Sequence, residues 1–192
     1  MKKNRLIAAL GILGVSLAIG LSSTSAHADD TDLHKTSTGT FSVNTGDLKL
    51  ESVPSFDFGT TNLKDLVSGT TLKNQSTTNN TLSVSDYRGA SNDKWNLTAA
   101  LGNFTNQTGS GSVTGTIEFK TNSSAAGTID SSASNVWNYT DADTKGASTA
   151  SATVDNDATS LTTVANNDVD GGTYSANVTW TLSDTSADTS AN

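Results

Sequence analysis

The feature that most constrains this chain is a strictly alternating stretch near its C-terminal end, from Tyr174 to Leu182. Apolar and polar residues occupy alternate positions, with Tyr174, Ala176, Val178, Trp180 and Leu182 separated by Ser175, Asn177, Thr179 and Thr181. A period of two is typical of a β-strand that has one face on a core and the other face in water. An amphipathic helix would instead place its apolar residues three and four apart. The pattern therefore predicts one half-buried strand over residues 174–182.

An earlier stretch ends in the same way, because Trp95 and Leu97 lie two residues apart, as Trp180 and Leu182 do. Residues two apart project from the same face of a strand. We therefore expect the two Trp-x-Leu strands to meet in the fold, with both tryptophans in one apolar cluster. Two roles remain open for these tryptophans. A core role is favoured over an exposed platform for stacking sugars, because both lie on the apolar side of an alternating strand.

The rest of the chain also favours strands, because no segment shows a sustained helical apolar face. Alternating runs predict strands at 48–53, 81–85, 95–101 and 115–119, with weaker ones near Val154 and over 161–164. Phe56 and Phe58 are expected to extend the first strand beyond Pro54, and residues 63–66 form a helical turn ended by Gly69. The segment 121–172 has few apolar residues, so it is expected to be the least ordered. Short runs separated by turn residues predict an all-β fold, a single β-sandwich-like domain.

The N-terminal residues predict export. Three basic residues precede an uncharged apolar run over 6–21, and Ala26-His27-Ala28 supplies a small-x-small cleavage site. This order is typical of a signal peptide. The run is shorter than the roughly 20 residues of a membrane-spanning helix, so cleavage after Ala28 is favoured over an uncleaved anchor. The predicted organisation is a signal peptide at 1–28, a polar leader at 29–42, a β domain at 43–185 and a disordered tail at 186–192.

Charge and residue usage argue against several functions. The formal net charge is −8, and removal of Lys2, Lys3 and Arg5 with the signal peptide would make it −11. So acidic a surface is poorly suited to nucleic acid, which needs a basic one. The chain has no cysteine, and its two histidines, His27 and His34, precede the predicted domain. Neither a His-based catalytic group nor a His/Cys metal cluster is therefore expected, and the sequence predicts a protein that is not an enzyme and has no cofactor.

Two acidic loops, 141–146 and 166–171, begin like calcium-binding loops. Both lack a carboxylate at the twelfth position, where such loops supply a bidentate Glu. Solvated turns are therefore expected at both places, and no metal site is predicted.

Arg88 is the only arginine after the predicted signal peptide. Its neighbours suggest an ion pair with Asp86 or Asp57, which would pin the loop before Trp95. The alternative is that the planar guanidinium group of Arg88 binds a carboxylate or acetyl oxygen of a ligand. The ion pair is favoured, because a planar guanidinium with acids close in sequence is usually satisfied by them.

Four segments together resemble the WxL domain of Gram-positive surface proteins: Val53–Gly59, Val84–Gly89, Trp95–Thr98 and Tyr174–Leu182. That family carries a proximal Trp-x-Leu motif and a distal Tyr-x-x-x-Leu-Thr-Trp-Thr-Leu-x-x-x-Pro motif. Trp95 and Leu97 match the proximal motif, and Tyr174, Thr179, Trp180, Thr181 and Leu182 match the distal one. The sequence departs at Val178, where the family has Leu, and at Ser186, where it has Pro.

The resemblance implies a surface protein attached non-covalently to the bacterial cell wall, with peptidoglycan as the ligand. It also implies assembly with a membrane-anchored surface protein. The sequence has no Leu-Pro-x-Thr-Gly sorting signal and no C-terminal apolar tail, so covalent anchoring to the wall is not expected. The alternative function is a structural subunit or adhesin whose β edges bind another protein by strand addition.

Overall fold

The computed structural model describes residues 35–89, 94–142 and 147–185. The predicted signal peptide and the predicted tail lie outside the described residues. The chain divides into two units, residues 1–42 and residues 43–192. In the described part of the first unit, residues 35–42 are exposed and form neither helix nor strand.

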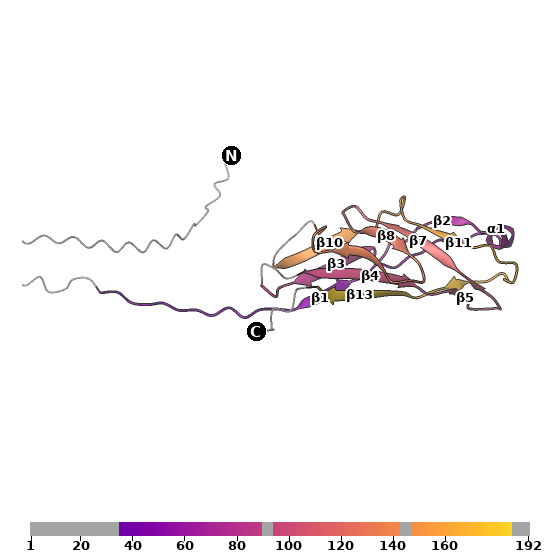
Figure 1. Ribbon diagram of the computed structural model, residues 1–192. Helices are drawn as coiled ribbons and strands as arrows, with labels where there is room; N and C mark the ends of the chain where they lie inside the picture. Colours follow the sequence, from indigo (N-terminus) through magenta and orange to yellow (C-terminus); the bar gives the residue numbers. More distant parts are fainter. Residues whose placement is uncertain (1–34, 90–93, 143–146, 186–192) are drawn as a thin grey trace, which may run out of the picture. The chain divides into compact units, whose positions relative to one another are not determined.

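The second unit is nearly all β, which confirms the predicted fold class (Figure 1). Its strands are β1 (Leu48–Ser52), β2 (Thr71–Lys73), β3 (Thr81–Asp86), β4 (Trp95–Leu101), β5 (Phe104–Asn106), β6 (Ser112–Val113), β7 (Gly115–Lys120), β8 (Ala126–Ile129), β9 (Ser134–Asn138), β10 (Ser148–Thr153), β11 (Ser160–Thr163), β12 (Tyr174–Ser175) and β13 (Val178–Asp184). A single short helix within the described residues, α1 (Leu63–Ser68), has Asn62 as its N-cap. It extends two residues beyond the predicted turn and ends at Gly69, as predicted.

The strands form four antiparallel sheets, with the orders β1-β3-β10, β2-β11-β7-β8, β13-β4-β9 and β12-β5-β6. Most neighbours within a sheet are distant in sequence. β10, for example, pairs with β3 over its whole length, from Ser148 opposite Asp86 to Thr153 opposite Thr81. Long-range pairing therefore sets the architecture, and short hairpins contribute less.

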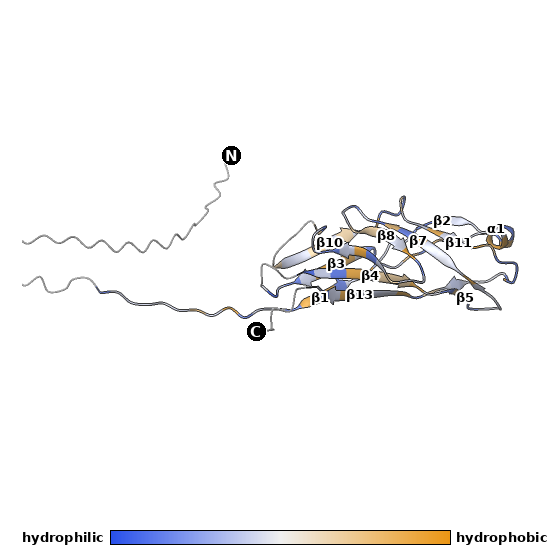
Figure 2. Cartoon of the chain, in the orientation of Figure 1, coloured by the Kyte–Doolittle hydropathy of each residue, from blue (hydrophilic) through white to orange (hydrophobic). Residues whose placement is uncertain are grey.

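One hydrophobic core joins three of these sheets. Its fully buried members include Leu82 and Val84 of β3, Leu97 and Ala99 of β4, Ile117 and Phe119 of β7, and Val136 and Trp137 of β9. The apolar residues alternate with polar ones along the strands (Figure 2). Facing sheets that share one core make the β-sandwich-like domain that the alternation predicted.

The two Trp-x-Leu strands pair directly, because β13 is the antiparallel neighbour of β4. Leu182 lies opposite Leu97, and Trp180 lies opposite Ala99. Trp95 is buried and packs edge to face on Trp137, with ring centroids 5.3 Å apart. Trp180 is half-buried against the same core. The prediction that both tryptophans join one apolar cluster is confirmed.

The prediction of one continuous strand over 174–182 is wrong, because the structure divides this stretch into β12 and β13. β12 pairs with β5, whereas β13 pairs with β4. The break follows a break in the partner, since Gly102 separates β4 from β5 and donates its N–H to Asn177 O at 2.9 Å. The alternation of half-buried and exposed residues nevertheless continues through the break.

Two further expectations are corrected. The described residues of the segment 121–172, which leave out 143–146, include the four strands β8, β9, β10 and β11. Its core side is built partly from small residues such as Ala150 and Ala152, both buried, which give a weak hydrophobic signal in the sequence. Conversely, residues 56–59 form no strand: Phe56 and Phe58 lie in a loop that joins β1 to α1.

Candidate functional site

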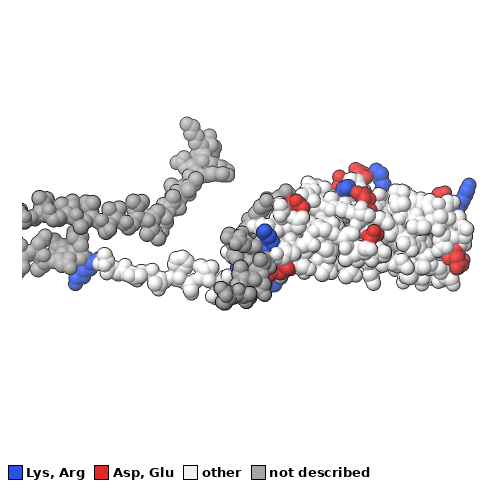
Figure 3. All heavy atoms as spheres, viewed as in Figure 1, with Lys and Arg blue, Asp and Glu red and all other residues white. Residues whose placement is uncertain are grey.

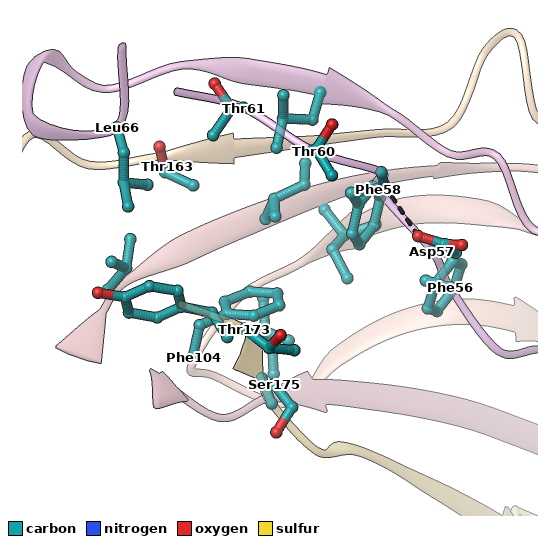
Figure 4. A pocket seen from close by; sticks show the side chains of 18 of the residues that line it. Phe56, Asp57, Phe58, Thr60, Thr61, Leu66, Phe104, Thr163, Thr173 and Ser175 are labelled. Carbon is teal, nitrogen blue, oxygen red and sulfur yellow. Dashed lines mark hydrogen bonds between the residues drawn. The ribbon is translucent and has the colours of Figure 1, made fainter. Parts of the chain in front are cut away.

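A groove of about 630 Å³ lies at the end of the domain that carries α1, β2 and β5 (Figures 1 and 4). Five aromatic side chains line it, all half-buried: Phe56, Phe58, Phe104, Tyr174 and Trp180. Figure 4 shows Leu66 and Thr163 toward one end and Phe56 and Phe58 toward the other. A volume of this size and a mostly apolar lining are typical of small-ligand sites. This aromatic groove is the candidate functional site.

The loop that carries Phe56 and Phe58 is held in place by Asn74. The Asp57 N–H donates to Asn74 Oδ1 at 3.0 Å, and the Gln75 N–H donates to Asp57 O at 2.6 Å. Asn74 itself is buried, and its Nδ2 donates to Asn156 Oδ1 at 2.8 Å. Buried amide groups with satisfied hydrogen bonds fix a unique local arrangement. This wall of the groove is therefore preformed.

Trp180 belongs both to the core and to the groove. Its ring packs edge to face on Phe119, with centroids 5.7 Å apart, and Phe119 packs the same way on Phe56 at 6.1 Å. Phe56 in turn stacks on Phe58 at 5.9 Å. A continuous row of four rings therefore connects the distal motif to the groove loop. The two roles considered for this tryptophan, core residue and surface platform, are compatible in one position.

The other motif residues divide between the groove and the core. Tyr174 lines the groove, and its hydroxyl donates to Asp170 O at 2.8 Å, which fixes the ring. Trp95 and Leu97 are buried in the core, and Leu182 packs against it. None of these three lines the groove. The proximal motif is thus structural, whereas Tyr174 and Trp180 of the distal motif line the groove together with Val178, which stands where the family motif has its first Leu.

Arg88 lies at the opposite end of the domain and is held by acids, as predicted. Its Nε and Nη2 donate to the two carboxylate oxygens of Asp86, each at 2.9 Å. Its Nη1 lies 2.6 Å from Asp184 Oδ2. The Asp86 side chain is only 8% exposed and that of Arg88 17%, whereas that of Asp184 is 54% exposed. The cluster ties the end of β3 to the end of β13.

Of the two acids considered as partners of Arg88, Asp86 is the one observed. Asp57 lies in the groove loop, where its carboxylate accepts the Gly59 N–H at 2.9 Å. Asp184 had no signal in the sequence, because it becomes a neighbour of Arg88 only when β13 pairs with β4. Both edges of the guanidinium fork are engaged by these acids. The geometry therefore favours the structural role of Arg88 over a role in holding a ligand.

The electrostatics of the cluster agree with this role. The hydrogen bond from Arg88 lowers the pKa of Asp86 below its ordinary value, and burial of the carboxyl partly opposes the effect. The hydrogen bond to Asp86 raises the pKa of Arg88 further. The pair is therefore charged throughout the physiological range.

The described residues contain no group of three His, Cys, Asp or Glu side chains arranged to hold a metal ion. Of the two acidic loops, residues 143–146 of the first lie outside the described residues. In the second, Asn166 Oδ1 accepts the Asp168 N–H at 2.9 Å, and Asn166 Nδ2 donates to Ser112 O at 2.8 Å. These contacts stabilise a turn. Within the part of the chain that the structure describes, no helix is long and apolar enough to cross a membrane.

Paired Trp-x-Leu strands in one sheet of a β-sandwich-like domain, with an aromatic groove at one end, define a compact β-type binding module. Residues 27–186 match the WxL domain family, which is described as a surface cell wall-binding domain. The chain belongs to this family, as its motifs indicated. It is therefore a cell wall-binding domain of the cell surface. Neither the curated proteins nor the solved structures contain a match to this chain.

Proposed function

We propose that this protein is exported by cleavage of residues 1–28 and attaches non-covalently to the wall of a Gram-positive bacterium by binding peptidoglycan in the aromatic groove. The observation that carries the proposal is the position of Tyr174 and Trp180. These residues of the distal motif line a preformed groove together with three phenylalanines. Aromatic rings offer apolar faces to the C–H faces of sugars. Rings that are already half-buried in a groove lose little side-chain conformational freedom when a ligand binds.

The polar residues of the groove suit a neutral ligand. Hydroxyl groups of Ser55, Thr60, Thr61, Thr173 and Ser175 lie among the lining residues, and no Lys or Arg does. Asp57 and Asp170 are the lining acids. Phosphate groups of anionic wall polymers would need basic partners, whereas sugar hydroxyls and acetamido groups bind well to hydroxyls and backbone amides. The groove therefore favours peptidoglycan over an anionic polymer.

Binding is proposed to occur without catalysis. The carboxylates of the two lining acids already accept backbone N–H groups, Asp57 from Gly59 at 2.9 Å and Asp170 from Ser110 at 3.4 Å. The long acids Glu51 and Glu118 are not among the residues that line the groove. A glycosidase would need two carboxyl groups facing across the scissile bond.

A second candidate function is a subunit held at the surface by a membrane-anchored protein. Leu63 and Val164 are large apolar side chains that remain exposed in the domain, and a protein partner would cover them. In this case retention on the wall would require that partner.

Co-sedimentation with purified, protein-free peptidoglycan separates the two candidates. We expect the wild-type protein to sediment with the polymer alone, and Tyr174→Ala to bind at least tenfold more weakly. Tyr87→Ala is the matched control, because Tyr87 is an exposed tyrosine that does not line the groove. Circular dichroism should show that both variants are folded. Failure of the wild-type protein to bind, or equal loss in both variants, would contradict the proposal.

The salt dependence of the same assay tests the mechanism. Exposed charges on the viewed face are scattered between wide uncharged areas (Figure 3), and anionic wall polymers would repel an acidic protein at long range. Salt at about 0.15 M screens such repulsion within about 8 Å. Binding to whole walls should therefore persist, or strengthen modestly, as the salt concentration rises toward this value. A loss of binding with salt would indicate a basic binding surface instead.

A further inference from the structure

The outer edge of β12 and β13 lies along the aromatic groove, and no strand of the described residues pairs with it. β12 is an outer strand of the sheet β12-β5-β6, and β13 is an outer strand of the sheet β13-β4-β9. Residues 174–182 contain neither a charged residue nor a proline, although both are usual devices against further pairing at an edge. The residues that line the groove from this edge include Tyr174, Ala176, Val178 and Trp180, which we call the edge residues.

The backbone groups of the edge residues point away from β4 and β5. Asn177 O accepts the Gly102 N–H at 2.9 Å, and Thr173 O accepts the Gln107 N–H at 2.8 Å. Alternate residues of a strand direct their N–H and C=O groups to opposite sides. The odd-numbered residues of 173–181 therefore face the partner strands, and the even-numbered edge residues face outward. Within the described residues, these outward N–H and C=O groups have no hydrogen-bond partner.

A second wall of the groove, the loop that carries Phe56 and Phe58, also has unpaired backbone groups (Figure 4). The Ser55 N–H donates to Asn79 O at 2.7 Å, which bonds one side of the loop to the segment before β3. Phe56 and Phe58 lie two residues apart and stack with ring centroids 5.9 Å apart, as side chains on one face of an extended chain do. Their own N–H and C=O groups have no hydrogen-bond partner among the described residues. Two walls of the groove therefore offer the groups with which a β-strand pairs.

The acids of the groove add a preference for charge. Asp57 accepts the Gly59 N–H through Oδ1, and Asp170 accepts the Ser110 N–H through Oδ2. The second carboxylate oxygen of each acid has no partner in the part of the chain that the structure describes, and both residues are exposed. No Lys or Arg lines the groove. Carboxylates bind ammonium groups by charge-assisted hydrogen bonds, so the groove is complementary to a peptide that carries an amino group.

We propose that the groove binds the peptide part of peptidoglycan as an added β-strand along the edge residues, with a peptide amino group at Asp57 or Asp170. The proposal rests on the proposed function and specifies which part of the polymer is recognised. Strand addition gives affinity through main-chain hydrogen bonds and specificity through pockets for alternate side chains. The small Ala176, between Tyr174 and Val178 on the same face, leaves room for one side chain of the added strand. Sugars attached to the peptide can still contact the aromatic rings.

Competition in the co-sedimentation assay tests which part of the polymer is recognised. Purified peptidoglycan is digested with an amidase that cuts the bond between glycan and peptide, and the peptides are separated from the glycan strands. Each fraction is added to intact peptidoglycan and the full-length protein recovered after export. We expect the peptides to displace the protein. Glycan strands and N-acetylated peptides should need concentrations at least about tenfold higher, because they lack either the peptide backbone or the amino group that the groove binds.

Hydrogen exchange of single amides, followed by NMR, tests whether the peptides add as a strand. The N–H groups of Ala176 and Val178 face outward and should exchange at least about tenfold more slowly when the peptide fraction is bound. The Thr179 N–H, which faces β4, is the internal control and should change less. Peptides that displace the protein without slowing exchange at Ala176 and Val178 would overturn the proposal.

The outcomes of the competition assay separate this inference from the proposed function. Wild-type protein that does not sediment with intact peptidoglycan contradicts both. If the protein sediments and the glycan strands displace it at lower concentrations than the peptides do, only the recognition of the peptide is contradicted. The same holds if N-acetylated peptides compete as well as untreated ones.

Discussion

Deletion of either carboxylate that pairs with Arg88 tests whether burial determines how much an ion pair contributes to the stability of this domain. Asp86→Ala and Asp184→Ala each delete one carboxylate from the same guanidinium and change the net charge equally. They differ in environment, because the side chain of Asp86 is 8% exposed and that of Asp184 is 54% exposed. Effects of overall charge therefore cancel in the comparison, and the two acids differ in burial and in the number of bonds that they accept from Arg88.

The expected costs follow from the contacts. Asp86 accepts bonds from Arg88 Nε, Nη2 and the backbone N–H, at 2.9, 2.9 and 3.2 Å. Breaking a fully buried pair costs about 3–5 kcal/mol, whereas exposed pairs contribute about 0.2–1 kcal/mol. Arg88 keeps some exposure, so we expect Asp86→Ala to lower the free energy of unfolding by about 2–4 kcal/mol. Asp184→Ala should lower it by less than about 1 kcal/mol.

Guanidinium denaturation followed by tryptophan fluorescence and circular dichroism measures both costs. The midpoint should shift with an unchanged slope, which indicates a change in stability alone. A cost for Asp184→Ala equal to or larger than that for Asp86→Ala would refute the reasoning from burial.

The same pair predicts an acid limit to stability. Arg88 lowers the pKa of Asp86 in the folded state, so the folded protein holds this proton less tightly than the unfolded chain does. The stabilisation is therefore complete above the unfolded pKa of about 3.9 and is lost as the pH falls through the folded pKa. Wild-type stability should decline below about pH 4, and Asp86→Ala should show a shallower decline there. Identical acid profiles would contradict this account.

Two further substitutions test the packing. Gly69→Ala should destabilise the protein by at least about 1–2 kcal/mol, the cost of a left-handed backbone for an L-residue, because Gly69 has a φ of +79° and an added Cβ would lie 2.9 Å from Thr163 O. Gly171→Ala, where a Cβ would meet nothing within 4 Å, should stay within about 0.5 kcal/mol in the same denaturation assay. Trp180→Ala should cost about 2–4 kcal/mol, near the lower end for core aromatics because the ring is half-buried, and Trp180→Phe should restore most of it. A thermal or chemical unfolding midpoint unchanged in Trp180→Ala would contradict the packing on Phe119.

Several elements could be predicted from the sequence because their determinants are local. β4 has the predicted bounds, 95–101. Its four buried apolar residues lie two apart in the sequence, and a β-strand places such residues on one face. α1 ends at Gly69, where a positive φ favours glycine. Arg88 and Asp86 are two residues apart, so their contact needs no long-range information.

The family could also be predicted from motifs, because the Trp-x-Leu pairs and their flanking segments can be read directly from the order of residues. The position of the groove could not be predicted in this way. Its loop depends on Asn74, whose buried amide gains its role only through Asn156, 82 residues away. Asp184 likewise meets Arg88 only after β13 has paired with β4.

The choice of strand partners was decided by the tertiary structure alone. The alternation over 174–182 specifies which side chains face inward, and that side of the prediction is confirmed. It contains no information about where the neighbouring strand ends, and the break opposite Gly102 divides the stretch in two. β10 was weak in the sequence because alanine buries little apolar area, yet pairing with β3 orders all six of its residues. Side-chain periodicity is a property of a single strand, whereas pairing is decided by backbone hydrogen bonds and core contacts between segments far apart in the chain.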